Sequence, residues 1–268
     1  MSEQEELSPL AFRGLNPTRE EHYLRALFAG PHIADLPPEP DEFDAWAGFS
    51  EPSIYTNDYE GSCAECEEEN WRAGQNHVNG LRVRFSKEAV HAAYRAQTGG
   101  EGKRHDSGLN LGDTLDWHAK NAVADTDGKK HLGGPHGSLN VKDLATLSKA
   151  CYYFHGLKLG IASGQLQRLT PDQVITGLGK ESRVDHCVAA VGRKIINGAR
   201  FWKIETWGFY LFLDEPSFAN ILFEAWVRSK DPDRFLPSGL TIEGWDEAEV
   251  LRQWAVFSGA PIEGGLRS

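Results

Sequence analysis

The chain has 268 residues, of which 40% are hydrophobic and 25% charged, and these values are typical of a globular protein with one large domain or two small ones. The formal net charge is −11, and an acidic surface repels phosphate groups, so we expect neither a nucleic acid nor an anionic membrane as a partner. Four Cys in a chain of this length do not form the pattern of a disulfide scaffold and fit a reducing compartment.

The beginning of the chain shows no targeting signal. Its first residues are polar and acidic, whereas a signal peptide needs a basic region followed by an apolar one. No apolar run approaches the roughly 18 residues that a membrane-spanning helix needs. We therefore expect a cytoplasmic protein with no membrane partner.

Residues 1–54 are predicted to form a tail, a helix and a wrapping segment. Thr18 and Glu21 have the spacing of a capping box, and an apolar stripe follows them, so the sequence predicts a helix over residues 18–29. Residues 30–58 are rich in Pro and acidic residues, which indicates an extended segment that wraps around the rest of the protein.

Acidic residues gather in two runs. The second run, residues 65–69, holds four Glu. A run of like charges usually forms a solvated surface, so we predict an exposed, solubilising face for both runs. The first run comprises Glu39, Asp41, Glu42 and Asp44.

Four helices are predicted between residues 63 and 154, and apolar stripes support the second and the fourth of them. Ser86 is predicted to cap the second helix, Asp113 the third and Asn140 the fourth. A glycine-rich stretch before the third helix, residues 98–112, is typical of a surface loop. The four helices are predicted over residues 63–73, 86–97, 113–122 and 140–154.

Short runs rich in Val, Ile and aromatic residues follow and predict strands. Asn197-Gly198 lies between two of them, and Asn-Gly is the strongest short-range signal for a hairpin. Because helices lead and strands follow, the sequence predicts an α+β fold with a helical half and a mostly antiparallel half. The strands are predicted over residues 157–162, 187–196, 199–206 and 209–213. Further helices are expected over residues 216–227 and, within a C-terminal extension of residues 229–268, over residues 246–257.

One set of residues supplies what a nucleophilic cysteine needs: a lowered thiol pKa, an imidazole within reach and donors for an oxyanion. Gly61 and Ser62 precede Cys63 at the start of a predicted helix, whose N-terminus favours the thiolate through its positive potential. His186 opens a predicted strand, and Glu205 lies at the end of the next one. The three stretches are GSC, DHCVAAVG and ETWG.

The order of these stretches resembles that of papain-family cysteine peptidases. Those proteins carry G-S-C at a helix start, a His that opens a strand in an H-A-V-x-x-V-G context, and N-S-W-G after the next strand. The layout also resembles a group of phage and bacterial papain-like proteins with G-[DN]-C, G-H-A-V and T-W-G elements. The resemblance covers residues 55–228 and implies a papain-like domain there.

Carried over by position, the resemblance implies that Cys63 is the nucleophile, that His186 is the base, and that Glu205 stands in place of the Asn that orients the imidazole. A carboxylate can accept the imidazole N–H and stabilise the imidazolium. The resemblance also implies that Trp207 shields this hydrogen bond and that Asn57, six residues before Cys63, helps to form an oxyanion hole. The implied function is hydrolysis of a peptide or another amide, without a cofactor.

Departures from the family pattern favour a second interpretation. Papain's Trp after the nucleophile is Ala64 here, and the Glu residues that follow oppose a thiolate by Coulomb repulsion. The alternative is a catalytically inactive papain-like protein with a structural or docking role. Its partners would be proteins, in a homo- or hetero-oligomer, for example as a component of a phage virion.

Two further patterns indicate other chemistry. Cys63 and Cys66 have the spacing of a redox pair or of half a zinc site, but a second such pair is missing, and a disulfide between them stays open. His118, His131 and His136 gather around a glycine-rich stretch with no acidic partner at ligand spacing, and a surface loop is the simpler interpretation. We therefore expect no metal site.

Overall fold

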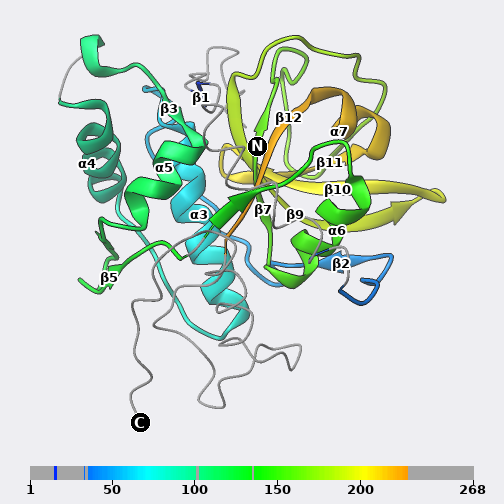
Figure 1. Cartoon of the computed structure of the whole chain (residues 1–268), viewed down its shortest axis with the longest axis horizontal. Coiled ribbons are helices and arrows are strands. Elements are labelled where there is room, and N and C mark those ends of the chain that lie inside the picture. Colours follow the sequence, from blue (N-terminus) through cyan, green and yellow to red (C-terminus); the bar gives the residue numbers. More distant parts are fainter. Residues whose placement is uncertain (1–14, 17–32, 34–35, 101–102, 135, 229–268) are drawn as a thin grey trace, which may run out of the picture.

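The computed structural model shows a helical half beside a sheet half (Figure 1). The large sheet has eight strands, and all but one of its pairings are antiparallel. This architecture confirms the predicted α+β fold. The structure describes residues 15–16, 33, 36–100, 103–134 and 136–228.

Several predicted elements lie outside the described residues. They are the helices expected over residues 18–29 and 246–257, together with the rest of the C-terminal extension. Within the part of the chain that the structure describes, no helix combines the length and the apolar character needed to cross a bilayer.

The central helix, α3 (Cys63–Val78), begins where the sequence predicts and ends beyond the expected Ala73. It is buried from its first residue through Asn76. A helix enclosed on all sides has no exposed face, so its sequence carries no amphipathic pattern that would mark its end.

The next helix, α4 (Lys87–Thr98), agrees with its prediction. Oγ of Ser86 accepts a hydrogen bond from the backbone N of Ala89 at 3.1 Å, so Ser86 is the N-cap. The helix ends at Gly99, whose φ of 84° is the left-handed conformation that glycine adopts without strain.

The cap predicted for the third helix is wrong. α5 (Leu111–His118) is capped by Asn110, whose Oδ1 accepts a hydrogen bond from the backbone N of Asp113 at 3.1 Å. Asp113 lies inside the first turn, where a carboxylate is also favourable because of the helix dipole.

The cap predicted for the fourth helix is also wrong. α6 (Leu144–Tyr153) is capped by Asp143, and Asn140 instead closes a turn by accepting a hydrogen bond from the backbone N of Lys142 at 3.0 Å. In both places two cap-type residues stand three positions apart, and the path of the preceding chain decides which of them caps.

The hairpins of the sheet agree closely with prediction. β9 (His186–Ile196) and β10 (Ala199–Thr206) pair antiparallel, and β10 pairs in turn with β11 (Phe209–Asp214). Asn197 and Gly198 form the first turn with φ values of 50° and 80°, as a two-residue hairpin turn with two positive φ angles requires.

One predicted helix is half wrong. α7 (Glu215–Ile221) covers only the first part of the range 216–227, and the remainder forms β12 (Leu222–Arg228). β12 pairs with β6 (His136–Ser138) and with β7 (Leu157–Ile161), so neighbouring strands satisfy its backbone groups. A short apolar run of this kind has no periodicity that separates a buried strand from a buried helix.

Seven of the eight strands follow the order β6–β12–β7–β9–β10–β11–β8, and the eighth, β2, pairs with β9 outside this order. Strand β9 lies inside the sheet, and α3 packs against it. Cys63 and Trp71 of α3 share an apolar cluster with Cys187, Ala189 and Val191 of β9. The remaining short elements are β1 (Leu15–Asn16), β2 (Phe43–Asp44), η1 (Lys103–His105), β3 (Leu109–Asn110), β4 (Val123–Ala124), β5 (Lys130–His131) and β8 (Gln173–Ile175).

Candidate active site

Cys63 is the first residue of α3, and its side chain is only 2% exposed. Ser62 holds the N-cap position, but its Oγ shares a hydrogen bond with Oγ1 of Thr56 at 2.8 Å and does not cap the helix. The backbone N of Gly61 donates to Oδ1 of Asp106 at 2.8 Å. The loop before the helix is thus fixed by side chains, and Cys63 lies where the helix dipole favours a thiolate.

His186 is the first residue of β9 and is 1% exposed. Its Nε2 shares a hydrogen bond with Oγ1 of Thr206 at 2.8 Å. Its ring stacks on the indole of Trp207, with ring centroids 4.1 Å apart and planes 14° apart. The predicted shielding residue therefore covers the imidazole, and a hydroxyl from the neighbouring strand fixes its orientation.

Glu205 makes different contacts from those the resemblance implies. Its Oε1 accepts hydrogen bonds from Nδ2 of Asn70 and from the backbone N of Gly208, each at 3.2 Å. Burial raises the pKa of Glu205, and burial together with the Glu205 carboxylate raises the pKa of Glu67 well above its ordinary value. Burial therefore favours the neutral form of both carboxyl groups, and the hydrogen bond on Nε2 of His186 involves the next residue, Thr206.

Asn57 is buried, and its Nδ2 donates to the backbone O of Glu60 at 3.2 Å. The amide thus supports the loop that leads to α3. Its role as an oxyanion donor stays a prediction.

Cys63 of α3 and Cys187 of β9, the residue after His186, lie in one buried apolar cluster. Burial, with a contribution from the nearby Cys63, raises the pKa of the Cys187 thiol well above its ordinary value. Nζ of Lys158, on the adjacent strand β7, donates to the backbone O of Ala64 at 2.7 Å. The fold therefore brings the predicted nucleophile close to the residue that follows the predicted base.

The four Glu that follow Cys63 are buried, and the prediction of an exposed acidic face for this run is wrong. Oε2 of Glu68 accepts a hydrogen bond from Nζ of Lys158 at 3.0 Å, and its Oε1 accepts from Arg72 and Arg228. Burial alone would raise the pKa of Glu68, but Arg228 and Lys158 hold it well below its ordinary value. Cations from distant elements make this burial possible.

The four cysteines are free thiols. Sγ of Cys66 lies 3.3 Å from Oγ of Ser62, and burial raises the pKa of the Cys66 thiol to about 12. Cys66 is therefore an unreactive thiol beside the candidate nucleophile.

The histidines around the glycine-rich stretch do not lie in a surface loop. His118 and His131 are buried, and Nε2 of His131 donates to Oδ2 of Asp125 at 2.8 Å. His136 is half-buried in β6 and bonds to Oδ1 of Asp116 at 3.0 Å. Each of them has a carboxylate partner that sequence spacing did not indicate.

A short segment from the N-terminal part of the chain lies against the same site. β1 pairs in parallel with β3, and the backbone N of Leu15 donates to the backbone O of Asp185 at 3.4 Å. Leu15 is also buried in the apolar cluster that contains Cys63. β1 therefore contacts both the residue before His186 and the surroundings of Cys63.

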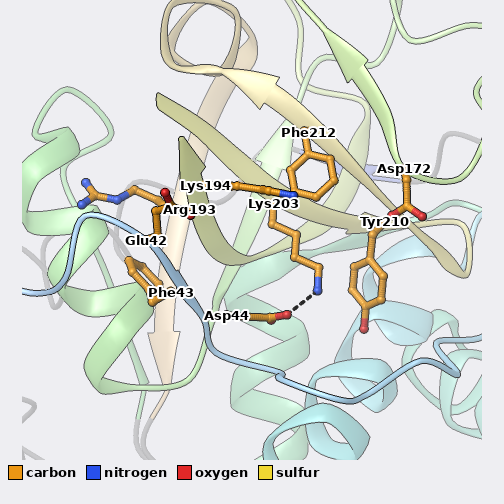
Figure 2. A pocket seen from close by; sticks show the side chains of 9 residues that line it. All are labelled: Glu42, Phe43, Asp44, Asp172, Arg193, Lys194, Lys203, Tyr210 and Phe212. Atoms are coloured by element: carbon orange, nitrogen blue, oxygen red, sulfur yellow. Dashed lines mark hydrogen bonds and ion pairs between the residues drawn. The ribbon is translucent and has the colours of Figure 1, made fainter. Parts of the chain in front are cut away.

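A pocket of about 390 Å³ opens between the segment around β2 and strands β9 to β11 (Figure 2). Nζ of Lys203 bonds to Oδ2 of Asp44 at 2.7 Å there and lies over the ring of Tyr210. None of the predicted site residues is among the described residues that line it, so we do not place the chemistry in this pocket.

Solved structures with the same arrangement identify the fold. A structure of one of the mite allergens Blo t 1 and Der p 1 aligns with a TM-score of 0.63 over 85% of this chain and 82% of that chain, at 14% identity. Procathepsin L 3 from the midgut of Tenebrio molitor larvae aligns with a TM-score of 0.61 over 82% and 76%, at 13% identity. The chain has the papain-like fold.

The cysteine protease Amb a 11 of ragweed pollen, in its proform, aligns with a TM-score of 0.59 over 79% of this chain and 65% of that chain, at 17% identity. No family model matches the sequence, and no curated protein matches it. The papain-like fold is thus formed by a sequence that is only 13–17% identical to these three proteins, and the similarity establishes the fold and not the activity.

Proposed function

We propose that the chain is a papain-type thiol hydrolase that cleaves a peptide or another amide through Cys63 and His186. The observation that carries this proposal is the way His186 is held. Its Nε2 bonds to Thr206 and its ring stacks on Trp207, at the start of the strand that packs against the Cys63 helix. An imidazole fixed through one nitrogen can transfer a proton through the other.

In the proposed reaction, His186 takes the proton of the Cys63 thiol, and the thiolate attacks the carbonyl carbon of the substrate. The C–N bond then breaks, the imidazolium gives its proton to the leaving amine, and a thioester remains on Cys63. Water, deprotonated by His186, attacks the thioester, and the C–S bond breaks to release the acid. The N-terminus of α3 and the Asn57 amide are the proposed donors to the oxyanion.

Glu205 supports this arrangement as a positioning residue. Its carboxylate joins the turn that carries Trp207, through Gly208, to Asn70 of α3. In this proposal Thr206 orients the imidazole, and Glu205 holds the end of β10 so that both Thr206 and Trp207 stay in place.

The contacts of β1 support the proposal that the structure is a closed form of the enzyme. Cys63 and His186 are almost fully buried, and Leu15 lies in the apolar cluster of Cys63 and bonds through its backbone N to Asp185, the residue before His186. Two of the similar structures are proenzymes, a procathepsin and a protease in its proform. We expect a substitution that removes the apolar contacts of Leu15 to open the site.

Alkylation of the full chain by iodoacetamide tests the proposal. We expect Leu15→Asp to increase the labelling rate of Cys63 by about tenfold or more, because an exposed thiolate reacts and a buried one does not. Mass spectrometry locates the label, and Cys63→Ser in the same background is the control. A rate in Leu15→Asp at pH 6 no higher than that of a small free thiol would overturn the enzymatic proposal.

The alternative function is a docking or structural role without catalysis, for example in a phage particle. The burial of Cys63 and His186 favours it, because a substrate cannot reach them in this form. Co-purification with a multimer or particle that Cys63→Ser leaves intact, in a chain whose Cys63 stays unreactive, supports this role. Loss of assembly on that substitution counts against it.

A further inference from the structure

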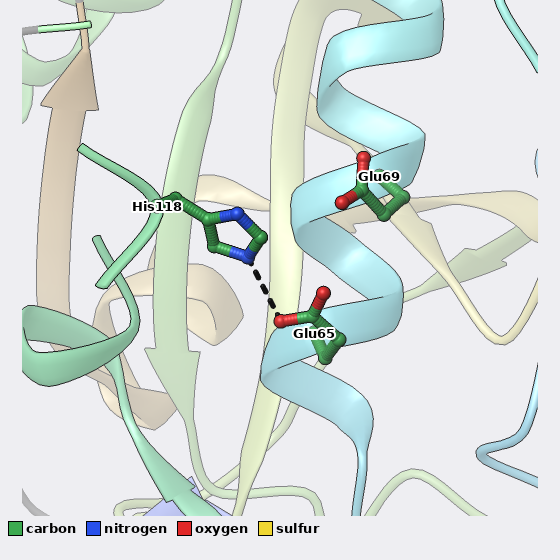
Figure 3. A group of neighbouring side chains, drawn as sticks. All are labelled: Glu65, Glu69 and His118. Atoms are coloured by element: carbon green, nitrogen blue, oxygen red, sulfur yellow. Dashed lines mark hydrogen bonds and ion pairs between the residues drawn. The ribbon is translucent and has the colours of Figure 1, made fainter. Parts of the chain in front are cut away.

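Three buried side chains in the helical half point toward one another (Figure 3). Glu65 and Glu69 are four positions apart on α3, so they lie on one face of that helix, and His118 is the last residue of α5. One ligand atom from each residue lies within 4.8 Å of the other two. All three side chains are 0% exposed.

The polar atoms of this cluster outnumber their hydrogen-bond partners. Nε2 of His118 donates to Oε2 of Glu65 at 2.9 Å. Among the described residues, Oε1 of Glu65, Oε2 of Glu69 and Nδ1 of His118 have no hydrogen-bond partner, although they are buried. Buried carboxylate oxygens without a partner are costly, and such groups call for an explanation.

The neighbouring side chains leave these oxygens unsatisfied. Nε2 of Gln97, on α4, donates to Oε2 of Glu65 at 2.7 Å, which is the oxygen that His118 already contacts. Arg72 reaches Oε1 of Glu69 at 3.5 Å, and it is shared with Glu68 and with the backbone O of His131. A cation between Glu65 and Glu69 would satisfy the remaining oxygens.

We propose that Glu65, Glu69 and His118 bind a divalent transition-metal ion of the zinc type. One imidazole and two carboxylates form a ligand set that suits Zn²⁺, whereas Mg²⁺ and Ca²⁺ prefer oxygen ligands alone. Ligand atoms around a four-coordinate zinc ion lie about 3.4 Å apart, so small side-chain rotations would close the site. A water molecule or the amide oxygen of Gln97 would be the fourth ligand.

This site has a structural role in the helical half. It joins α3 to α5 and begins two residues beyond Cys63. The ion would also balance the charge of Glu65 and Glu69, of which Arg72 contacts only Glu69, at 3.5 Å. The ion would therefore stabilise the helix that carries the candidate nucleophile, whether or not that nucleophile is active.

Metal titration of the full chain tests the proposal. After removal of metals by a chelator, we expect one Co²⁺ to bind per chain with the visible absorption of a four-coordinate site, and Zn²⁺ to displace it. Glu69→Gln and His118→Gln should each weaken binding at least tenfold. His131→Gln is the matched control, because His131 is also buried beside a carboxylate but lies outside the cluster, and it should leave binding unchanged.

X-ray absorption on the zinc-loaded wild-type chain keeps the test independent of how well the variants fold. The proposal expects one imidazole nitrogen and otherwise oxygen ligands. A sulfur ligand would assign the ion to Cys63 and Cys66 and overturn the proposal. Failure of the wild-type chain to bind either metal, or unchanged binding in folded Glu69→Gln and His118→Gln, would overturn it as well.

Discussion

The two acidic runs of this chain look alike in the sequence, but in the fold the first lies at the surface and the second is buried. Members of the first run pair with cations of the sheet at the protein surface, where Asp41 and Arg200 are 76% and 50% exposed. The second run is buried in α3, and its Glu68 meets Lys158 and Arg228, from β7 and β12. The difference teaches that a run of like charges does not reveal burial, because the cations that permit burial come from distant strands.

The energetic consequences of the two environments differ greatly. Exposed pairs lose their attraction to solvent screening and contribute little to stability. A buried carboxylate cannot lose its partners without leaving charges unpaired in a medium of low polarity. Substitutions that remove one charge from each run should therefore separate the two environments clearly.

Glu68→Gln should have the largest effect. It keeps the shape of the side chain but leaves the buried Lys158, Arg228 and Arg72 without their shared counter-charge. We expect a loss of about 3–5 kcal/mol in the free energy of unfolding, measured by urea denaturation. Asp41→Asn is the control and should change it by less than about 0.5 kcal/mol. Equal losses in the two variants would show that the comparison is wrong.

Gly74→Ala tests the packing between α3, which carries the second acidic run, and the segment that follows the first run. A Cβ at this position on α3 would collide with the ring of Trp46, which follows the first acidic run and is fully buried. Trp46 cannot move freely, because its Nε1 donates to the backbone O of His155. We expect a loss of about 1–3 kcal/mol in the free energy of unfolding. A gain, as helix propensity alone would give, would mean that this contact is loose.

Asp44→Asn should have the smallest effect. The substitution removes the charge that pairs with Lys203 at 2.7 Å on a half-exposed surface. We expect a loss of about 0.2–1 kcal/mol at low ionic strength that disappears in 1 M salt. A loss that persists at high salt would show that this pair resembles the buried one more than the comparison allows.

The sequence predicts the hairpins of the sheet well because their signals are local. Asn197-Gly198 determines the turn between β9 and β10 by backbone conformation alone, and Ser86 caps α4 through a bond to a residue three positions away. The misplaced caps at Asp113 and Asn140 show the limit of such signals, since both are cap-type residues a few positions from the true cap.

Features that depend on distant contacts could not be predicted. The strand β12 is defined by pairing with β6 and β7, and its apolar sequence suits a helix equally well. Thr206 of β10 contacts His186 of the neighbouring strand β9, whereas the resemblance implied the adjacent Glu205 for that role. The T-W-G element contains this threonine, but the sequence did not show that the threonine contacts His186.

The pH dependence of Cys63 alkylation, measured in Leu15→Asp with and without His186→Ala, tests the central claim most directly. If the two residues form a thiolate–imidazolium pair, the rate should stay high down to about pH 5 in Leu15→Asp. After His186→Ala, the rate should instead fall about tenfold per pH unit below the ordinary thiol pKa of about 8.5. Identical pH profiles in the two proteins would contradict the account.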